Sequence, residues 1–185
     1  MKAVVAGLVG LVLLTGSAYA QHQHGDGYAS MMARPIKALS NEQVPQLSEG
    51  RGMGLSLPAE LNSYPGPLHA LEMADALNLT PDQHHRLLSI KEDMGAKAIA
   101  LGHQIIAAET QLDQVFASGK ADEADVTRQL AEIGRVNGEL RTIHILAHIK
   151  TKALLTSDQV VAYDTGRGYR PMEDQQHRSN HRKKH

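Results

Sequence analysis

"LTPDQ" at Leu79–Gln83 and "LTSDQ" at Leu155–Gln159 decide the fold, because each pentapeptide has the pattern of a helix start. In the first, the Thr80 side chain can accept a hydrogen bond from the backbone N–H of Gln83, and the Gln83 side chain can reach back to the Thr80 backbone. Pro81 fits the first helical position, where no backbone N–H is needed. We therefore predict that one helix begins at each pentapeptide.

Apolar residues recur every three or four positions along two long segments between these pentapeptides, which is the spacing of a helix face. Gly119 suits the end of the first helix, and Asp122 can begin the second. At about 1.5 Å per residue each helix is roughly 50 Å long, and the short connection makes the two antiparallel. The two series are Leu87, Ile90, Met94, Ala98, Leu101, Ile105, Ala108, Leu112 and Val115, then Val126, Leu130, Ile133, Asn137, Leu140, His144, Ala147, Thr151 and Leu154.

Shorter elements are predicted on either side of this pair. Pro67 suits the start of a short helix, and the second pentapeptide leads into a last helix over residues 157–169. Residues 21–66, which we call the arm, are rich in Gly, Pro, Ser and Met and predict an irregular chain with short helical turns. Residues 170–185 are basic and rich in His without apolar periodicity, which predicts a disordered tail. We thus expect an all-α protein, a long antiparallel helical hairpin with short flanking helices, in a domain over residues 67–169.

The first 20 residues have the three parts of a secretory signal peptide. Lys2 precedes the apolar run Ala3–Leu14, and Ala18 and Ala20 hold the small-residue positions of a cleavage site. The apolar run is shorter than the about 20 residues that cross a bilayer. We predict cleavage after Ala20, export, and no membrane insertion afterwards.

The composition argues against several classes of function. Lys and Arg number 19 and Asp and Glu number 20, so no strong positive field points to nucleic acid. The chain has no cysteine, and therefore neither a thiolate metal ligand nor a cysteine nucleophile. The sequence also lacks a phosphate-binding glycine loop and a G-x-S-x-G motif. We predict that the protein is not an enzyme and uses no organic cofactor.

The second long segment carries apolar residues outside its main series. A second apolar face on a solvent-exposed helical hairpin usually meets a partner, most commonly a second copy of the chain. We therefore predict a homodimer. The residues of this outer face are Val136, Ile143, Ile145, Leu146 and Ile149.

The two pentapeptides, bracketing a long helical hairpin behind a signal peptide, resemble the LTxxQ family of periplasmic proteins. That family includes Spy/CpxP-type chaperones, ZraP-type zinc-resistance proteins and CnrX-type heavy-metal sensors. The resemblance covers roughly residues 69–169, and "GRGMGL" and "GELRTIHILAH" are similar to a heavy-metal sensor branch. It implies a four-helix hooked hairpin that dimerises in the periplasm. The implied roles are holding of unfolded clients without ATP, or reversible metal binding coupled to an envelope stress response.

Histidine spacing indicates a metal site on the second long helix. His144 and His148 are four residues apart, so both imidazoles project from one face and can bind one cation. His69 and Met73 have the same spacing on the first short helix, and Glu92 lies near the start of the first long helix. Antiparallel packing could bring these groups together. Imidazole, carboxylate and thioether ligands without thiolate suit Ni²⁺, Co²⁺, Zn²⁺ or Cu.

The resemblance implies a related but shuffled ligand set. CnrX-type sensors use an early His pair, a Glu and a late His-x-x-x-Met pair. Here Met73 stands where a second early His would be, and His148 where the late Met would be. Structural roles compete with this reading: His144 lies on the apolar series and could be a buried core histidine, and Met73 could be a core filler.

Two main functions follow from these patterns. The first is periplasmic heavy-metal sensing or metal-stress resistance through a divalent transition metal bound by histidines. The alternative is a metal-independent Spy/CpxP-type holding chaperone or stress-response regulator, with a charged rim around an apolar face. A third reading is a partner that caps a membrane sensor protein. The candidate rim residues are Arg128, Arg135, Arg141 and Lys150.

Overall fold

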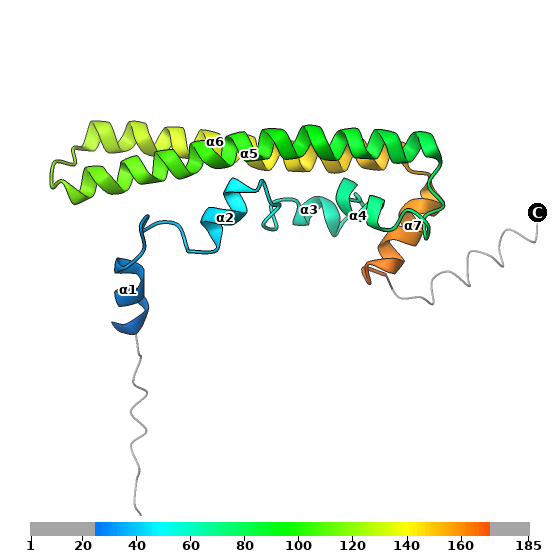
Figure 1. The fold of residues 1–185 in the computed structure, drawn as a ribbon, viewed down its shortest axis with the longest axis horizontal. Helices are drawn as coiled ribbons and strands as arrows, with labels where there is room; N and C mark the ends of the chain where they lie inside the picture. The colour runs from blue at the N-terminus through cyan, green and yellow to red at the C-terminus, as the bar shows by residue number, and fades with distance from the viewer. Residues whose placement is uncertain (1–24, 171–185) are drawn as a thin grey trace, which may run out of the picture. The chain divides into compact units, whose positions relative to one another are not determined.

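The computed structural model describes residues 25–170, in which every regular element is a helix and no strand occurs. The chain divides into two compact units, residues 1–33 and residues 34–185. The predicted signal peptide and the tail beyond residue 170 lie outside the described residues. Within the described part, no helix is long and apolar enough to cross a membrane. The helices are α1 (Gly25–Met32), α2 (Gln43–Ser48), α3 (Leu57–Glu60), α4 (Pro67–Glu72), α5 (Pro81–Ala117), α6 (Glu123–Leu154) and α7 (Ser157–Gly166) (Figure 1).

The first unit contributes one described element, α1. From Tyr28 onward its side chains are solvent-exposed, and Tyr28 and Met32 are each about three-quarters accessible. The second unit contains α2 to α7 and carries the features developed below.

The two long helices begin where the sequence predicts. Thr80 accepts a hydrogen bond from the backbone N–H of Gln83, and the side chain of Gln83 caps the Thr80 backbone in return. Asp122 caps the start of α6 by accepting from the Asp125 backbone N–H. Gly119 adopts a φ of 68° in the connection, a conformation that glycine takes at no steric cost. The all-α class and the two long helices are thus confirmed.

The long helices α5 and α6 lie side by side, and α2, α3 and α4 pack along them (Figure 1). One hydrophobic cluster joins the arm to both long helices. In it, Leu47 from α2 packs with Ile105 from α5 and Val136 from α6. Val136 is only 1% exposed, so the arm of the same chain covers this part of the predicted outer face. At the same contact a Cβ on Gly102 would overlap the Leu47 carbonyl, so the backbone of the arm approaches α5 where only glycine fits.

A second hydrophobic cluster lies at the other end of the helix pair. It includes Leu87 of α5, Leu155 at the end of α6 and Tyr163 of α7, and its partly buried members include Met73. The helix predicted after Pro67 ends earlier than the apolar spacing indicates, because the chain turns at residues 73–78 and Asn78 adopts a φ of 48°.

The two pentapeptides meet at this end through their glutamines. The Gln83 amide donates to Oε1 of Gln159 at 2.8 Å, and the Gln159 amide donates to Oε1 of Gln83 at 3.0 Å. We call this pair of side chains the glutamine clasp. Thr156 and Gln159 form the same capping box at α7 that Thr80 and Gln83 form at α5. The clasp therefore fixes α7 against the beginning of α5.

Candidate functional site

A cavity of about 890 Å³ lies within the second unit, between residues 49–69 and the two long helices, and we call it the arm cavity. Its walls come from the glycine-rich loop at residues 49–54, from α3 and α4, and from one face each of α5 and α6. Four of the five predicted ligands line it: His69, Glu92, His144 and His148. The structure thus brings together groups from three different helices.

The fifth predicted ligand, Met73, lies elsewhere. Met73 packs in the second hydrophobic cluster, and a Cβ on Gly166 of α7 would collide with its side-chain methyl group. Met73 is the residue that ends α4, and its backbone N–H still donates to the His69 carbonyl at 3.1 Å, but its side chain packs toward α7 and does not line the arm cavity. The structural reading of Met73 as a core filler therefore describes its position.

His144 occupies the inner wall of the arm cavity. Its side chain is 3% exposed, and its Nε2 atom is buried without a hydrogen-bond partner. Burial lowers the pKa of His144 from its ordinary value, and the neighbouring His148 lowers it further. The imidazole is therefore held in its neutral form, which is the form that binds a metal ion.

His148 lies one helical turn further along α6 and is 8% exposed. Its Nδ1 atom is 2.7 Å from the carbonyl oxygen of Tyr64. A carbonyl oxygen can only accept, so Nδ1 carries a hydrogen and donates it, and Nε2 is the ring nitrogen that this bond does not use. The backbone of the arm thus sets which ring nitrogen of His148 faces Tyr64.

Glu60 is a member of the site that sequence reasoning missed. It ends α3, is 7% exposed and places Oε2 3.3 Å from Nδ1 of His148. Its other oxygen, Oε1, accepts hydrogen bonds from the hydroxyls of Tyr163 at 2.5 Å and Tyr169 at 3.1 Å. No spacing or motif near Glu60 indicates this role, because its partners lie about a hundred residues away in the chain.

The remaining predicted ligands form the outer part of the arm cavity. His69 pairs with Glu72 at 2.9 Å on the surface of α4, and Glu92 is solvent-exposed on α5. Among the described residues, no three His, Asp or Glu side chains are arranged to hold one metal ion. The inner wall therefore offers two imidazoles, and further ligands would have to move toward them.

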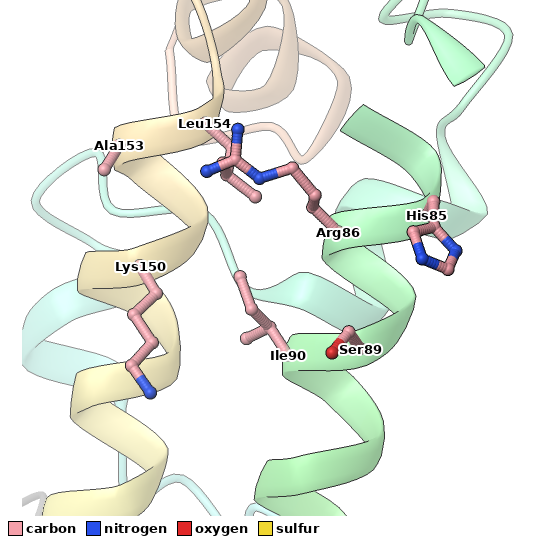
Figure 2. A pocket seen from close by; sticks show the side chains of 7 residues that line it. All are labelled: His85, Arg86, Ser89, Ile90, Lys150, Ala153 and Leu154. Atoms are coloured by element: carbon pink, nitrogen blue, oxygen red, sulfur yellow. The ribbon is translucent and has the colours of Figure 1, made fainter. Parts of the chain in front are cut away.

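A second hollow of about 450 Å³ lies on the surface between α5 and α6, near the end that the glutamine clasp closes (Figure 2). Figure 2 shows Arg86 extending from α5 toward α6, with Ile90 pointing between the helices and His85 pointing away. Lys150 lines the hollow from α6, and Arg86 also pairs with Asp82 at 3.6 Å. This hollow lacks a buried polar group, so the arm cavity is the better candidate site.

Comparisons of the chain with protein-family models, curated proteins and solved structures gave no match. The resemblance to LTxxQ proteins therefore depends on the two pentapeptides and their places in the fold. Function is argued below from the arm cavity and its side chains.

Proposed function

We propose that this protein binds a divalent transition metal ion in the arm cavity and serves in periplasmic metal sensing or metal-stress resistance. The observation that carries the proposal is the buried, unpartnered Nε2 atom of His144, with His148 one helical turn away. A buried nitrogen without a partner costs free energy, and a bound cation would remove that cost. A non-enzymatic role in an exported protein fits this chemistry.

The donor set suits a borderline-soft cation. Burial lowers the pKa of His144, which favours its neutral form, and Nδ1 of His148 donates to a carbonyl, which leaves Nε2 of that ring to face a metal. Two imidazoles with carboxylates nearby, in a chain without cysteine, favour Ni²⁺, Co²⁺, Zn²⁺ or Cu over Ca²⁺ or Mg²⁺. His144 and His148 would hold the metal, and the metal would supply the charge that draws further ligands inward.

The outer residues supply the sensing step. His69 lies on α4 and Glu92 on α5, on other walls of the same cavity. In a closed form, His69 and Glu92 would join the two histidines around the metal, and in the open form they stay apart. A metal that binds the closed form more tightly than the open form shifts the population toward the closed form. The difference between the two forms would be the signal, passed to a membrane sensor protein.

Titration calorimetry tests the proposal. The protein used begins at residue 21. Each of the five histidines near its ends is replaced by Gln so that the termini cannot bind metal. These histidines are His22, His24, His177, His181 and His185. Zn²⁺, Ni²⁺, Co²⁺ and Cu²⁺ are titrated separately into this background, into the His144→Ala/His148→Ala variant, and into the control His103→Ala. His103 is a solvent-exposed residue of α5.

The expected result is one metal bound with fixed stoichiometry, lost in the double variant and retained in the control. Circular dichroism verifies that the double variant keeps its helices. Equal binding by a folded double variant would contradict the proposal.

A metal-independent holding chaperone is the second candidate, and exposed apolar side chains favour it. Leu57, Leu61 and Leu68 on and beside α3 and α4 are 52%, 59% and 43% exposed. Such residues could hold the apolar segments of unfolded clients. Suppression of aggregation of a chemically unfolded protein, undiminished in the His144→Ala/His148→Ala variant, would favour this role.

A homodimer accompanies either function. Leu146 and Ile149 on α6 are 45% and 47% exposed, and they are the part of the predicted outer face that the arm leaves uncovered. Pairing with a second copy would remove both from water. Light scattering should report a dimer for the unaltered chain and a monomer for Leu146→Glu/Ile149→Glu.

A further inference from the structure

Glu60 is a buried acid that connects three elements around the arm cavity. It belongs to α3, its Oε2 atom faces His148 of α6, and its Oε1 atom faces Tyr163 of α7. Buried carboxylates are retained in proteins when hydrogen bonds compensate for the loss of water. Here Tyr163 and Tyr169 donate those hydrogen bonds to Oε1, while Nδ1 of His148 lies 3.3 Å from Oε2 and Arg167 lies 3.8 Å from Oε1.

Glu60 lies beside His148 in the position that a carboxylate takes next to a metal-binding histidine, at the ring nitrogen that does not bind the metal. A metal-binding imidazole donates its second ring N–H to a carboxylate or a backbone carbonyl, which fixes the ring and makes the other nitrogen more basic. Nδ1 of His148 lies near both kinds of oxygen, the Tyr64 carbonyl at 2.7 Å and the Glu60 carboxylate at 3.3 Å. Its Nε2 atom is therefore the one prepared for a ligand.

Gly66 keeps the space beside this nitrogen open. Its φ of −83° and ψ of 147° are accessible to any residue, so its backbone does not require glycine. A Cβ at Gly66 would lie 3.0 Å from Cε1 and 3.2 Å from Nε2 of His148, and 3.4 Å from Oε2 of Glu60. The missing side chain thus leaves room where His148 and Glu60 approach each other.

The second carboxylate oxygen of Glu60, Oε1, is hydrogen-bonded to α7. The Tyr163 hydroxyl donates to Oε1 of Glu60 and accepts from the backbone N–H of Gly66 at 3.2 Å. Tyr163 is fully buried, and burial followed by the hydrogen bond to Glu60 raises its pKa, so the hydroxyl stays protonated and remains a donor. A change at His148 therefore has a short hydrogen-bonded route to α7.

We propose that Glu60 is the acidic positioning residue of the metal site, and that it links occupancy of the site to α7 through Tyr163. This inference rests on the proposed metal binding in the arm cavity. Glu92, the acid that the sequence pointed to, is solvent-exposed on α5 and has no comparable contact with either histidine. The element that responds to metal is then α7, which the glutamine clasp also holds to α5.

The test compares Glu60→Gln with Glu49→Gln, a matched change of an exposed acid that lines the same cavity and is not a proposed ligand. ZnCl₂ and NiCl₂ are titrated by calorimetry into the background with the terminal histidines replaced. Hydrogen exchange of the α7 amides is measured with and without saturating metal. A purely structural role for Glu60 would alter stability without altering the metal-dependent part of this exchange.

In the unaltered background, metal should slow exchange in α7. Glu60→Gln should weaken metal binding about 10- to 100-fold, as loss of such an outer carboxylate does, and abolish the response of α7 at saturating metal. Glu49→Gln should keep the response. If Glu60→Gln does not fold, Tyr163→Phe serves instead: it keeps the carboxylate, so metal should still bind while α7 no longer responds.

The outcomes separate this inference from the proposed function. Absence of metal binding in the unaltered background overturns both. Metal binding without a change in α7 overturns the inference alone, as does an α7 response that persists in Glu60→Gln or in Tyr163→Phe.

Discussion

Gln83 and Gln159 hold each other through two reciprocal amide hydrogen bonds of 2.8 and 3.0 Å. Each Oε1 atom also caps its own helix, at the backbone N–H of Thr80 and Thr156. Each amide nitrogen additionally donates to a carbonyl of the opposite segment, Gln83 to Leu154 and Gln159 to Leu77. The two pentapeptides therefore form one structural unit, in which a single side chain both starts a helix and joins it to another.

Gln159→Ala should lower the free energy of unfolding by about 1–3 kcal/mol, because it removes a side-chain partner of the Thr156 backbone N–H and leaves part-buried groups of Gln83 and Leu77 unpaired. Urea denaturation followed by circular dichroism measures the change. Gln104→Ala, a change of an exposed glutamine within α5, should stay within about 0.5 kcal/mol. Equal effects of the two substitutions would show that the clasp does not stabilise the fold.

Gly102→Ala and Gly138→Ala should have opposite effects on stability. A Cβ at Gly102 meets the Leu47 carbonyl, so the arm must shift, and overpacking of this kind costs about 1–3 kcal/mol. Gly138 lies in α6 with nothing within 4 Å of an added Cβ, so alanine should stabilise by about 0.5–1 kcal/mol. Thermal unfolding midpoints that move in the same direction would argue against the close contact between arm and α5.

Acidification should destabilise the metal-free protein through His144. Burial lowers its pKa below the ordinary value of 6.5, so in that range the unfolded chain binds the proton more strongly than the folded one. The contribution of His144 to the free energy of unfolding is fully present above pH 6.5 and decreases as the pH falls below 6.5. Urea midpoints between pH 7.5 and 5.0, with a chelator present, should fall less steeply for His144→Gln. The exposed control His103→Gln should follow the unaltered protein, and an unchanged slope in His144→Gln would refute the assignment.

Met73→Leu should leave metal affinity within about twofold of the unaltered chain, because Met73 packs against α7 outside the arm cavity. His148→Ala should lower the same affinity at least about tenfold, because it removes a ligand. Calorimetry in the background without terminal histidines provides both values. A large loss in Met73→Leu would restore the thioether to the ligand set.

Gly66→Ala should weaken metal binding while it preserves the fold. The backbone of Gly66 is in an ordinary extended conformation, but a Cβ would crowd Nε2 of His148. We expect an affinity loss of about tenfold, in the range caused by a disturbed outer shell, with unchanged helical content. Unaltered affinity in Gly66→Ala would place the metal away from this nitrogen.

The helix starts were predictable because a capping box is local. Thr80 and Gln83 lie within one turn, so their types and spacing carry the whole signal. Val136 shows what spacing cannot decide, because an apolar residue outside the main series can face either a partner or a distant part of its own chain. The arm covers it here.

The candidate site was only partly predictable, because some of its contacts join residues that are far apart in the chain. His144 and His148 share a helical face by spacing alone, and both line the arm cavity. Glu60 has its main partner, Tyr163, 103 residues away, so only the tertiary fold reveals it. Met73 keeps the backbone register predicted from His69, but its side chain packs against α7, a contact that spacing along α4 cannot reveal.

The glutamine clasp also bears on how long a folded molecule lasts. It joins residues 76 positions apart, so it can close only after the intervening helices have paired. Contacts that form after the transition state leave the refolding rate almost unchanged and slow the unfolding rate. We therefore expect loss of the clasp to speed unfolding and shorten the lifetime of the native state, while newly made chains fold as quickly as before.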